Sequence, residues 1–198
     1  MSGKSFSRQA LRTALLMVVV ASQFLHGIDA KNVRLNSTNS TGVESFLEYH
    51  FHTYFDVNDP VQVAQAIELR NGVIANCVSK KIIAVPLHYH YDPENPVLEH
   101  NNDTKGLNMQ PVGPHPIGSF ETWVPVEYFA KLYEWFVQKR SPLTIFVHPL
   151  TKHELTDHTA RVVFMGKSYT LNTDTLREII PNFKSQYEYL GLGYANPE

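Results

Sequence analysis

Histidines dominate the chemistry that this sequence could perform. The chain has ten of them, and five lie in short segments flanked by aromatic residues, proline or an acidic residue: His50, His52, His115, His148 and His158. Histidine is the commonest transition-metal ligand in proteins, and its unperturbed pKa lies near neutrality. These segments therefore indicate a metal site, a proton-transfer site, or both.

The spacing of the first two histidines places them together. Residues 48–55 alternate in character as a β-strand does, and successive side chains of a strand point to opposite faces. His50, His52 and Tyr54 are therefore expected on one face, where two imidazoles can point into the same pocket.

The other three histidines lie where the backbone or a neighbour restricts them. His115 lies between two prolines, and His148 precedes Pro149 at the end of a predicted strand. His158 follows Asp157, whose carboxylate could orient it or another ligand from behind. In an antiparallel sheet, the strand that ends at His148 brings this residue toward His50 and His52.

The remaining histidines and nearby carboxylates are weaker candidates. Loop or surface positions are expected for His88, His90, His100 and His153, and His26 belongs to the N-terminal segment. Asp56 is expected to cap or end a strand and Glu121 to face solvent, although either could be a fourth ligand.

The elements that must position these residues follow from periodicity and turn signals. We expect strands over 48–55, 82–87, 119–124, 143–147 and 161–165, helices opening at Asp59-Pro60 and Pro125, a short helix over 174–180, and a long functional loop over 91–114. The order strand, helix, strand, strand, helix, strand predicts an α+β, ferredoxin-like split βαβ sandwich of the dimeric α+β barrel type with an extra strand. Such a sheet leaves one face open, which predicts a homodimer.

Composition places this domain in the chain. A hydrophobic fraction of 43% and a charged fraction of 18% are typical of a globular domain, and a formal charge of −2 argues against nucleic-acid binding. We expect a polar flexible segment over 31–46, the domain over 47–180 and a C-terminal tail, only partly ordered, over 181–198.

The first 30 residues have the layout of a secretory signal peptide. Three basic residues precede an apolar run over residues 15–25, and a small residue, Ala30, ends the segment. The run is shorter than the roughly 20 residues that a membrane span needs, which disfavours an anchor. Asn36, Asn39 and Asn102 begin N-x-S/T triplets, which suits glycosylation in a secretory lumen. Secretion, with no stable membrane span after cleavage, is the expectation.

The only cysteine, Cys77, excludes an intrachain disulfide and is expected to be a buried thiol at the end of a helix. Any metal must then be held by histidine and carboxylate. Phosphate-binding loops, dinucleotide fingerprints and the G-x-S-x-G nucleophile motif do not occur in the chain.

As a set, four segments resemble the small DOPA 4,5-dioxygenase family, whose fungal and bacterial members cleave aromatic rings. They are His50 to Asp56, Gly113-Pro114-His115-Pro116, Val147 to Thr151 and Asp157-His158-Thr159, and the resemblance covers about residues 47–175. It implies extradiol cleavage of DOPA or a related catechol by non-haem Fe(II) and O2. A histidine-rich site with open positions suits that chemistry.

On this resemblance, His52, His115 and His148 are the expected metal ligands, and His50 and His158 the expected acid-base or substrate-orienting groups. Any three of the five could be the ligands, and zinc or another divalent metal could replace iron. The alternatives are a secreted, non-catalytic protein that binds a metal or a small aromatic molecule on the same scaffold, and a surface-interaction protein whose histidines are structural.

Overall fold

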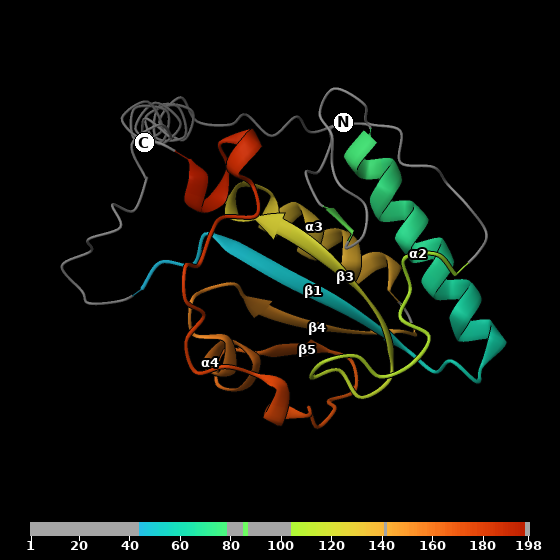
Figure 1. Cartoon of the computed structure of the whole chain (residues 1–198). Helices are drawn as coiled ribbons and strands as arrows, with labels where there is room; N and C mark the ends of the chain where they lie inside the picture. Colours follow the sequence, from blue (N-terminus) through green and yellow to red (C-terminus); the bar gives the residue numbers. More distant parts are fainter. Residues whose placement is uncertain (1–43, 79–84, 87–103, 141, 197–198) are drawn as a thin grey trace, which may run out of the picture. The chain divides into compact units, whose positions relative to one another are not determined.

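The computed structural model describes residues 44–78, 85–86, 104–140 and 142–196. Within these ranges one antiparallel sheet has the strand order β2-β3-β1-β4-β5 (Figure 1). Its strands are β1 (Glu48–Phe55), β2 (Val85–Pro86), β3 (Gly118–Pro125), β4 (Thr144–Pro149) and β5 (Val163–Met165). The helices are α2 (Pro60–Val78), α3 (Val126–Lys139) and α4 (Glu154–Thr159), followed by three 3₁₀ turns, Thr173–Thr175, Glu188–Leu190 and Gly193–Ala195. The α+β class is confirmed, and the elements from β1 to β4 follow the predicted order, but α4 between β4 and β5 was not predicted.

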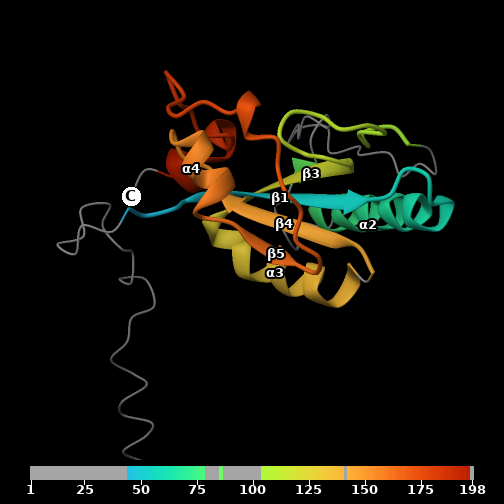
Figure 2. The same ribbon diagram turned by 90° about the horizontal axis from the view of Figure 1, so that it is seen from below.

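Helices α2 and α3 cover one face of the sheet, and α4 lies on the opposite side (Figure 2). The core on the helical side contains Phe51 and Phe55 of β1, Leu69 and Val73 of α2, and Phe136 of α3. The ring of Phe51 stacks on that of Phe136 at 5.3 Å. Phe51 and Phe55 point toward the helices. Since successive side chains of a strand alternate, His50, His52 and Tyr54 point away from the helices.

The start of α2 follows the predicted capping chemistry. The Asp59 carboxylate accepts hydrogen bonds from the backbone N–H groups of Val61 and Gln62, at 2.9 and 3.4 Å, and Pro60 is the first helical residue. The buried face of α2 contains Ala66, Leu69, Val73 and Ile74, whereas Val61 in its first turn is 62% exposed.

Two predicted elements differ in the structure. The expected helix over 174–180 is wrong: only Thr173–Thr175 form a 3₁₀ turn. The following backbone makes its hydrogen bonds elsewhere, since Arg177 N–H donates to the Glu154 carboxylate and Ile180 N–H to the Lys152 carbonyl. The strand predicted over 143–147 extends to Pro149, so His148 lies within β4.

The predicted C-terminal tail belongs to the same compact unit, which runs from Phe46 to the end of the chain. Residues 185–194 of this tail are hydrogen-bonded to Glu48 at the start of β1. The sheet face away from α2 and α3 is therefore covered by parts of the same chain. The homodimer was predicted because one sheet face would be open, and that reason no longer applies. The dimer stays a prediction.

Several predictions concern residues outside the described ranges. They are the signal peptide, the polar segment up to residue 43 and most of the strand over 82–87. The same holds for the asparagines of the three glycosylation triplets, Asn36, Asn39 and Asn102, and for four histidines, His26, His88, His90 and His100. For Cys77 only the backbone is described. No helix in the described part of the chain is long and apolar enough to span a membrane.

Candidate metal centre

The three central strands bring the first histidines together. His50 of β1 lies opposite His148 of β4 in the antiparallel register, and opposite Trp123 of β3 on its other side. His52 lies opposite Glu121 of β3. All five residues therefore share one face of the sheet, as the alternation in β1 predicts for His50 and His52.

Two further histidines come from segments that cross this face. Gly113, with φ of 57°, forms a tight turn in which Val112 and His115 exchange backbone hydrogen bonds, at 3.0 and 3.2 Å. This turn directs His115 against His52, with ring centroids 3.9 Å apart. His158, on α4, lies against His148, also at 3.9 Å. The structure therefore brings all five predicted histidines into one cluster.

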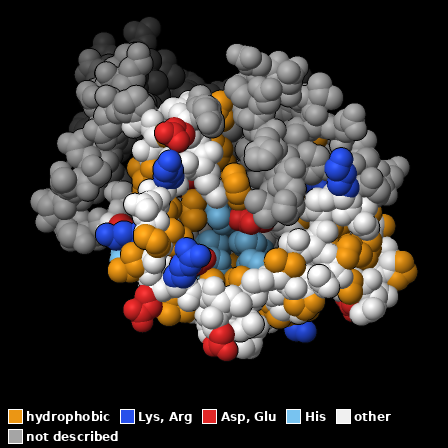
Figure 3. Space-filling view, in the orientation of Figure 1, with side chains coloured by type: hydrophobic (Ala, Val, Ile, Leu, Met, Phe, Trp, Pro, Cys, Tyr) orange, Lys and Arg blue, Asp and Glu red, His pale blue; other side chains and the backbone are white. Residues whose placement is uncertain are grey.

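The cluster lines a cavity of about 210 Å³. Leu150, Leu176 and Ile180 form an apolar wall, and the polar residues that line the cavity are the five histidines, Glu121, Thr151, Glu154 and Asp157. In the space-filling view the histidines lie in a hollow bordered by hydrophobic side chains (Figure 3). A small ring with polar substituents fits a cavity of this kind.

Backbone carbonyls determine the tautomers of two histidines. His148 Nδ1–H donates to the Pro149 carbonyl at 2.7 Å, and His158 Nδ1–H donates to the Glu154 carbonyl at 2.9 Å. A carbonyl oxygen only accepts, so Nδ1 carries the proton in both rings and the neutral ring has its lone pair on Nε2. This carbonyl-to-histidine arrangement is typical of the groups that orient metal-binding imidazoles.

His52 and His115 complete the set of neutral rings. The Nε2 atoms of His52 and His148 are 3.1 Å apart; without a cation, His52 Nε2–H donates to the His148 lone pair. Nδ1 of His115 is hydrogen-bonded to the Tyr54 hydroxyl at 2.7 Å. Nε2 is therefore the nitrogen of this ring that remains for a metal ion.

His50 has a different environment. Its Nδ1 forms an ion pair with the Glu121 carboxylate at 2.6 Å, and its Nε2–H donates to the Gln186 side-chain oxygen at 2.8 Å. Both partners accept, so both ring nitrogens carry protons and His50 is an imidazolium. Trp123 Nε1–H also donates to Glu121, at 2.8 Å, and the Trp123 ring stacks on His50 at 5.9 Å.

The pKa directions follow from these contacts. Burial lowers the pKa of His52 and His148 well below the ordinary value, and repulsion from neighbouring histidines lowers it further. Burial likewise lowers the pKa of His158, and that of His115 to about 4. Burial also opposes the charge on His50, but attraction to Glu121 and two hydrogen bonds outweigh it and raise the His50 pKa. The cluster therefore consists of four neutral imidazoles beside one cation.

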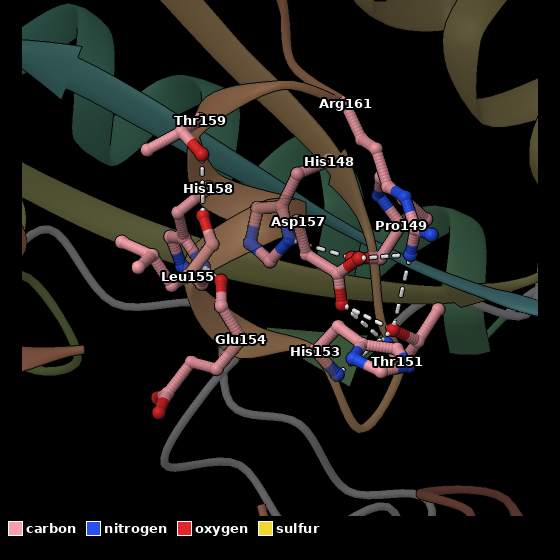
Figure 4. Close-up of polar contacts among 10 residues, drawn as sticks. All are labelled: His148, Pro149, Thr151, His153, Glu154, Leu155, Asp157, His158, Thr159 and Arg161. Carbon is pink, nitrogen blue, oxygen red and sulfur yellow. Dashed lines mark hydrogen bonds and ion pairs between the residues drawn. The ribbon is translucent and has the colours of Figure 1, made fainter. Parts of the chain in front are cut away.

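Two sequence-based interpretations of carboxylates are wrong. Glu121 was expected to face solvent, but its side chain is only 14% exposed and pairs with His50. Asp157 was expected to orient His158 or another ligand, but its carboxylate accepts from Thr151 N–H and hydroxyl, at 2.7 and 2.8 Å, and from Arg161 (Figure 4). Asp157 therefore holds the turn between β4 and α4, which positions His158 indirectly.

Gln186 was missed, because no pattern distinguishes one glutamine in a polar tail. The expectation for Asp56 agrees with the structure, since its carboxylate accepts from Asn58 N–H at 2.9 Å in the turn after β1.

The donor set suits a metal ion. Among the described residues two groups of three histidines have ligand atoms within 4.8 Å of one another: His50, His52 and His148, and His52, His115 and His158. His52 belongs to both groups, and His50 has both nitrogens protonated. His52, His115, His148 and His158 are then the four imidazoles that could donate lone pairs, and neutral imidazole is the form that binds metals.

Comparisons with known proteins identify the family of this chain. The profile of the Dopa 4,5-dioxygenase family matches residues 49–175. A DOPA 4,5-dioxygenase of Amanita muscaria is 38% identical over 149 residues, which cover 75% of this chain and 58% of that protein. An uncharacterized 21.2 kDa protein of Botryotinia fuckeliana is 37% identical over 79 residues, 35% of this chain and 43% of that protein.

The chain thus spans less than two thirds of the length of either relative. A crystal structure from Nostoc punctiforme, of a protein provisionally assigned as a dioxygenase, has a TM-score of 0.50 and 22% identity. It matches 66% of this chain and 90% of its own, which shows a shared fold. On the match over residues 49–175, this chain is a member of the Dopa 4,5-dioxygenase family.

Proposed function

We propose that the protein is an extradiol ring-cleaving dioxygenase that acts on DOPA or a related catechol with non-haem Fe(II). The observation that carries the proposal is the cluster of four neutral imidazoles, three buried and one partly buried, beside a cationic one, in a cavity large enough for a substituted catechol ring. A bound Fe(II) ion would bring the catechol and O2 together and allow O2 to react with the ring.

His52, His115 and His148 are the proposed ligands. The Nε2 atoms of His52 and His148 are 3.1 Å apart, close enough that both nitrogens could hold the same ion. His115 adds a third nitrogen beside His52, on a turn that Gly113 and two prolines restrict.

His158 and His50 are the proposed proton-transfer and orienting groups. His158 is neutral with its lone pair on Nε2, so it can take a proton from a catechol hydroxyl. His50 is cationic, and its charge favours a deprotonated catechol oxygen in the same cavity. The apolar wall of Leu150, Leu176 and Ile180 offers a nonpolar surface for the ring of the substrate.

One experiment tests this function. The protein is loaded with Fe(II) without air and mixed with L-DOPA, and air is then admitted while O2 consumption and the absorbance of a yellow product are followed. We expect stoichiometric O2 uptake and colour. Bound iron with no O2 uptake for any catechol offered would reject the dioxygenase and favour the non-catalytic metal- or aromatic-binding alternative.

Iron content of single variants tests the ligand assignment. We expect H52A, H115A and H148A to lose iron, and H158A to keep iron while losing activity. H153A is the matched control, since His153 begins the turn into α4 and is outside the cluster. If H158A loses iron while H148A or H115A retains it, His158 is a metal ligand and the histidine whose variant retains iron is not. Metal analysis of the isolated protein distinguishes iron from zinc.

Three broader proposals accompany the function. The element order and the strand order, with β5 added beside β4, support the ferredoxin-like split βαβ assignment. Secretion rests on the N-terminal sequence alone, and N-terminal sequencing of secreted protein with a glycosidase shift would test it. The homodimer is tested by light scattering on the purified protein, where a monomer mass would reject it.

A further inference from the structure

The C-terminal segment meets β1 beside the histidine cluster. Glu48 has no exposed surface, and its carboxylate accepts hydrogen bonds from the Ser185 hydroxyl, from Gln186 N–H at 2.9 Å and from Tyr194 N–H at 3.1 Å. A buried carboxylate is costly unless it is fully hydrogen-bonded, and this segment provides the partners. Glu48 and residues 185–194 all lie outside the family match over 49–175.

Two more contacts hold the segment in place. Gly193 has φ of 57°, and a Cβ atom there would lie 2.5 Å from Glu48 Cγ, so only glycine allows this approach. Its N–H donates to Glu127 at 3.2 Å, and Asn196 Nδ2 donates to the same carboxylate at 3.0 Å. Glu127 is in the first turn of α3, so the segment is attached to both β1 and α3.

This attachment positions one side chain at the candidate site. Gln186 donates its backbone N–H to Glu48 and accepts from His50 Nε2–H with its side chain. Glu48 and His50 are two residues apart on β1, so both side chains leave the same face of the strand. Glu121 holds the other ring nitrogen of His50, from β3. Two acceptors on opposite sides of the ring therefore determine its tilt and rotation.

We propose that Gln186 is a positioning residue that orients His50 for the reaction, and that the Glu48-anchored C-terminal segment is thereby a part of the active site. The inference rests on the proposed function for its catalytic consequence. Without Gln186, His50 keeps only the Glu121 contact, and its ring can swing into the cavity that it lines. The metal ligands are untouched, so metal binding is unaffected.

The test compares Q186A with two other variants of the full protein. Q186A keeps the backbone bond to Glu48 and removes only the acceptor, Q186E restores an acceptor, and E188Q is an exposed control in the same segment. For Q186A we expect wild-type iron content, a kcat about 10- to 100-fold lower and a KM changed by less than about threefold, since one hydrogen bond to a charged group is lost. Q186E should recover to within about threefold of wild type, and E188Q should match it.

A second readout does not depend on activity. In metal-free protein labelled with ¹⁵N-histidine, the Nε2–H of His50 should exchange slowly in wild type, Q186E and E188Q, and rapidly in Q186A. An unchanged His50 signal in Q186A, or an equal loss of kcat in E188Q, would overturn the inference. If wild-type protein with bound iron cleaves no catechol, the proposed function fails; the His50 exchange rates still show whether Gln186 holds the ring.

Discussion

Acid should unfold the metal-free protein because of the neutral histidine cluster. The pKa values of His52, His115, His148 and His158 are lowered in the folded state, first by burial and then chiefly by repulsion among the histidines. In the unfolded chain each titrates near 6.5, so below that pH the unfolded state binds protons that the native state excludes. The free energy of unfolding therefore falls as the pH falls below about 6.5.

His50 does not offset this loss. Its pKa is raised in the folded state, so its contribution to stability is already complete below the unfolded pKa, and it is lost only as the pH rises through the folded value. The pKa of Glu121 is lowered, despite burial, by the His50 charge. Its contribution is present above the unfolded pKa of a glutamate and is lost as the pH falls, in the same direction as that of the four neutral histidines.

His115 gives the magnitude. Its pKa falls from 6.5 to about 4, and one proton of difference changes the free energy of unfolding by about 1.4 kcal/mol per pH unit. Across that window His115 alone accounts for about 3 kcal/mol, against a total of about 5–15 kcal/mol for a typical domain. Because the pKa values of His52, His148 and His158 are also lowered, the metal-free protein should unfold cooperatively between about pH 6 and pH 4.

Urea unfolding of metal-free protein between about pH 7.5 and pH 5 measures the effect. We expect H115Q to reduce the slope of the unfolding free energy against pH by about 1.4 kcal/mol per unit. I145V is the control, because it removes a buried methyl group from β4, costs about 1 kcal/mol and leaves the slope unchanged. A wild-type free energy that is flat below about pH 6.5, or a wild-type slope in H115Q, would refute the reasoning.

Three further predictions concern stability. G193A should lower Tm by about 5 °C, because a Cβ atom at φ 57° would lie 2.5 Å from Glu48. An unchanged Tm in calorimetry would contradict the close contact between Gly193 and Glu48. D157N should lower the free energy of unfolding in urea by about 2 kcal/mol, since it weakens the hydrogen bonds from Thr151 and Arg161. An unchanged free energy would mean that these hydrogen bonds do not stabilise the turn. F136A should lower the free energy of unfolding by about 3–5 kcal/mol and V137A by less than about 0.5 kcal/mol, because Phe136 is fully buried and Val137 is 51% exposed. Equal losses would mean that α3 does not bury the face that contains Phe136.

Local signals in the sequence predict much of the site. The alternation over 48–55 places His50, His52 and Tyr54 on one face, because the strand period depends only on neighbouring residues. The Asp59-Pro60 start of α2 is also local, since the cap and the first turn lie within four residues. The five histidines are identifiable because each lies in a short segment of unusual composition.

The roles of Glu121 and Asp157 could not be predicted in the same way. Whether Glu121 faces solvent or His50 depends on the register of β3 against β1 and on the segments that cover this face. The direction of the Asp157 carboxylate depends on a turn that Thr151 and Arg161 complete. The failed helix over 174–180 has a similar cause, because α4 and the preceding turn provide its backbone partners.

By itself the sequence determined which residues can bind a metal and which of them share a strand face, since residue type and strand period are local properties. Only the tertiary structure decided that His50 is a cation while His52, His115, His148 and His158 stay neutral. That division arises because Glu121 on β3 and Gln186, 136 positions away along the chain, contact His50, whereas the other four rings pack against one another. Charge at a buried site depends on such distant partners, because burial and nearby charges set the pKa there.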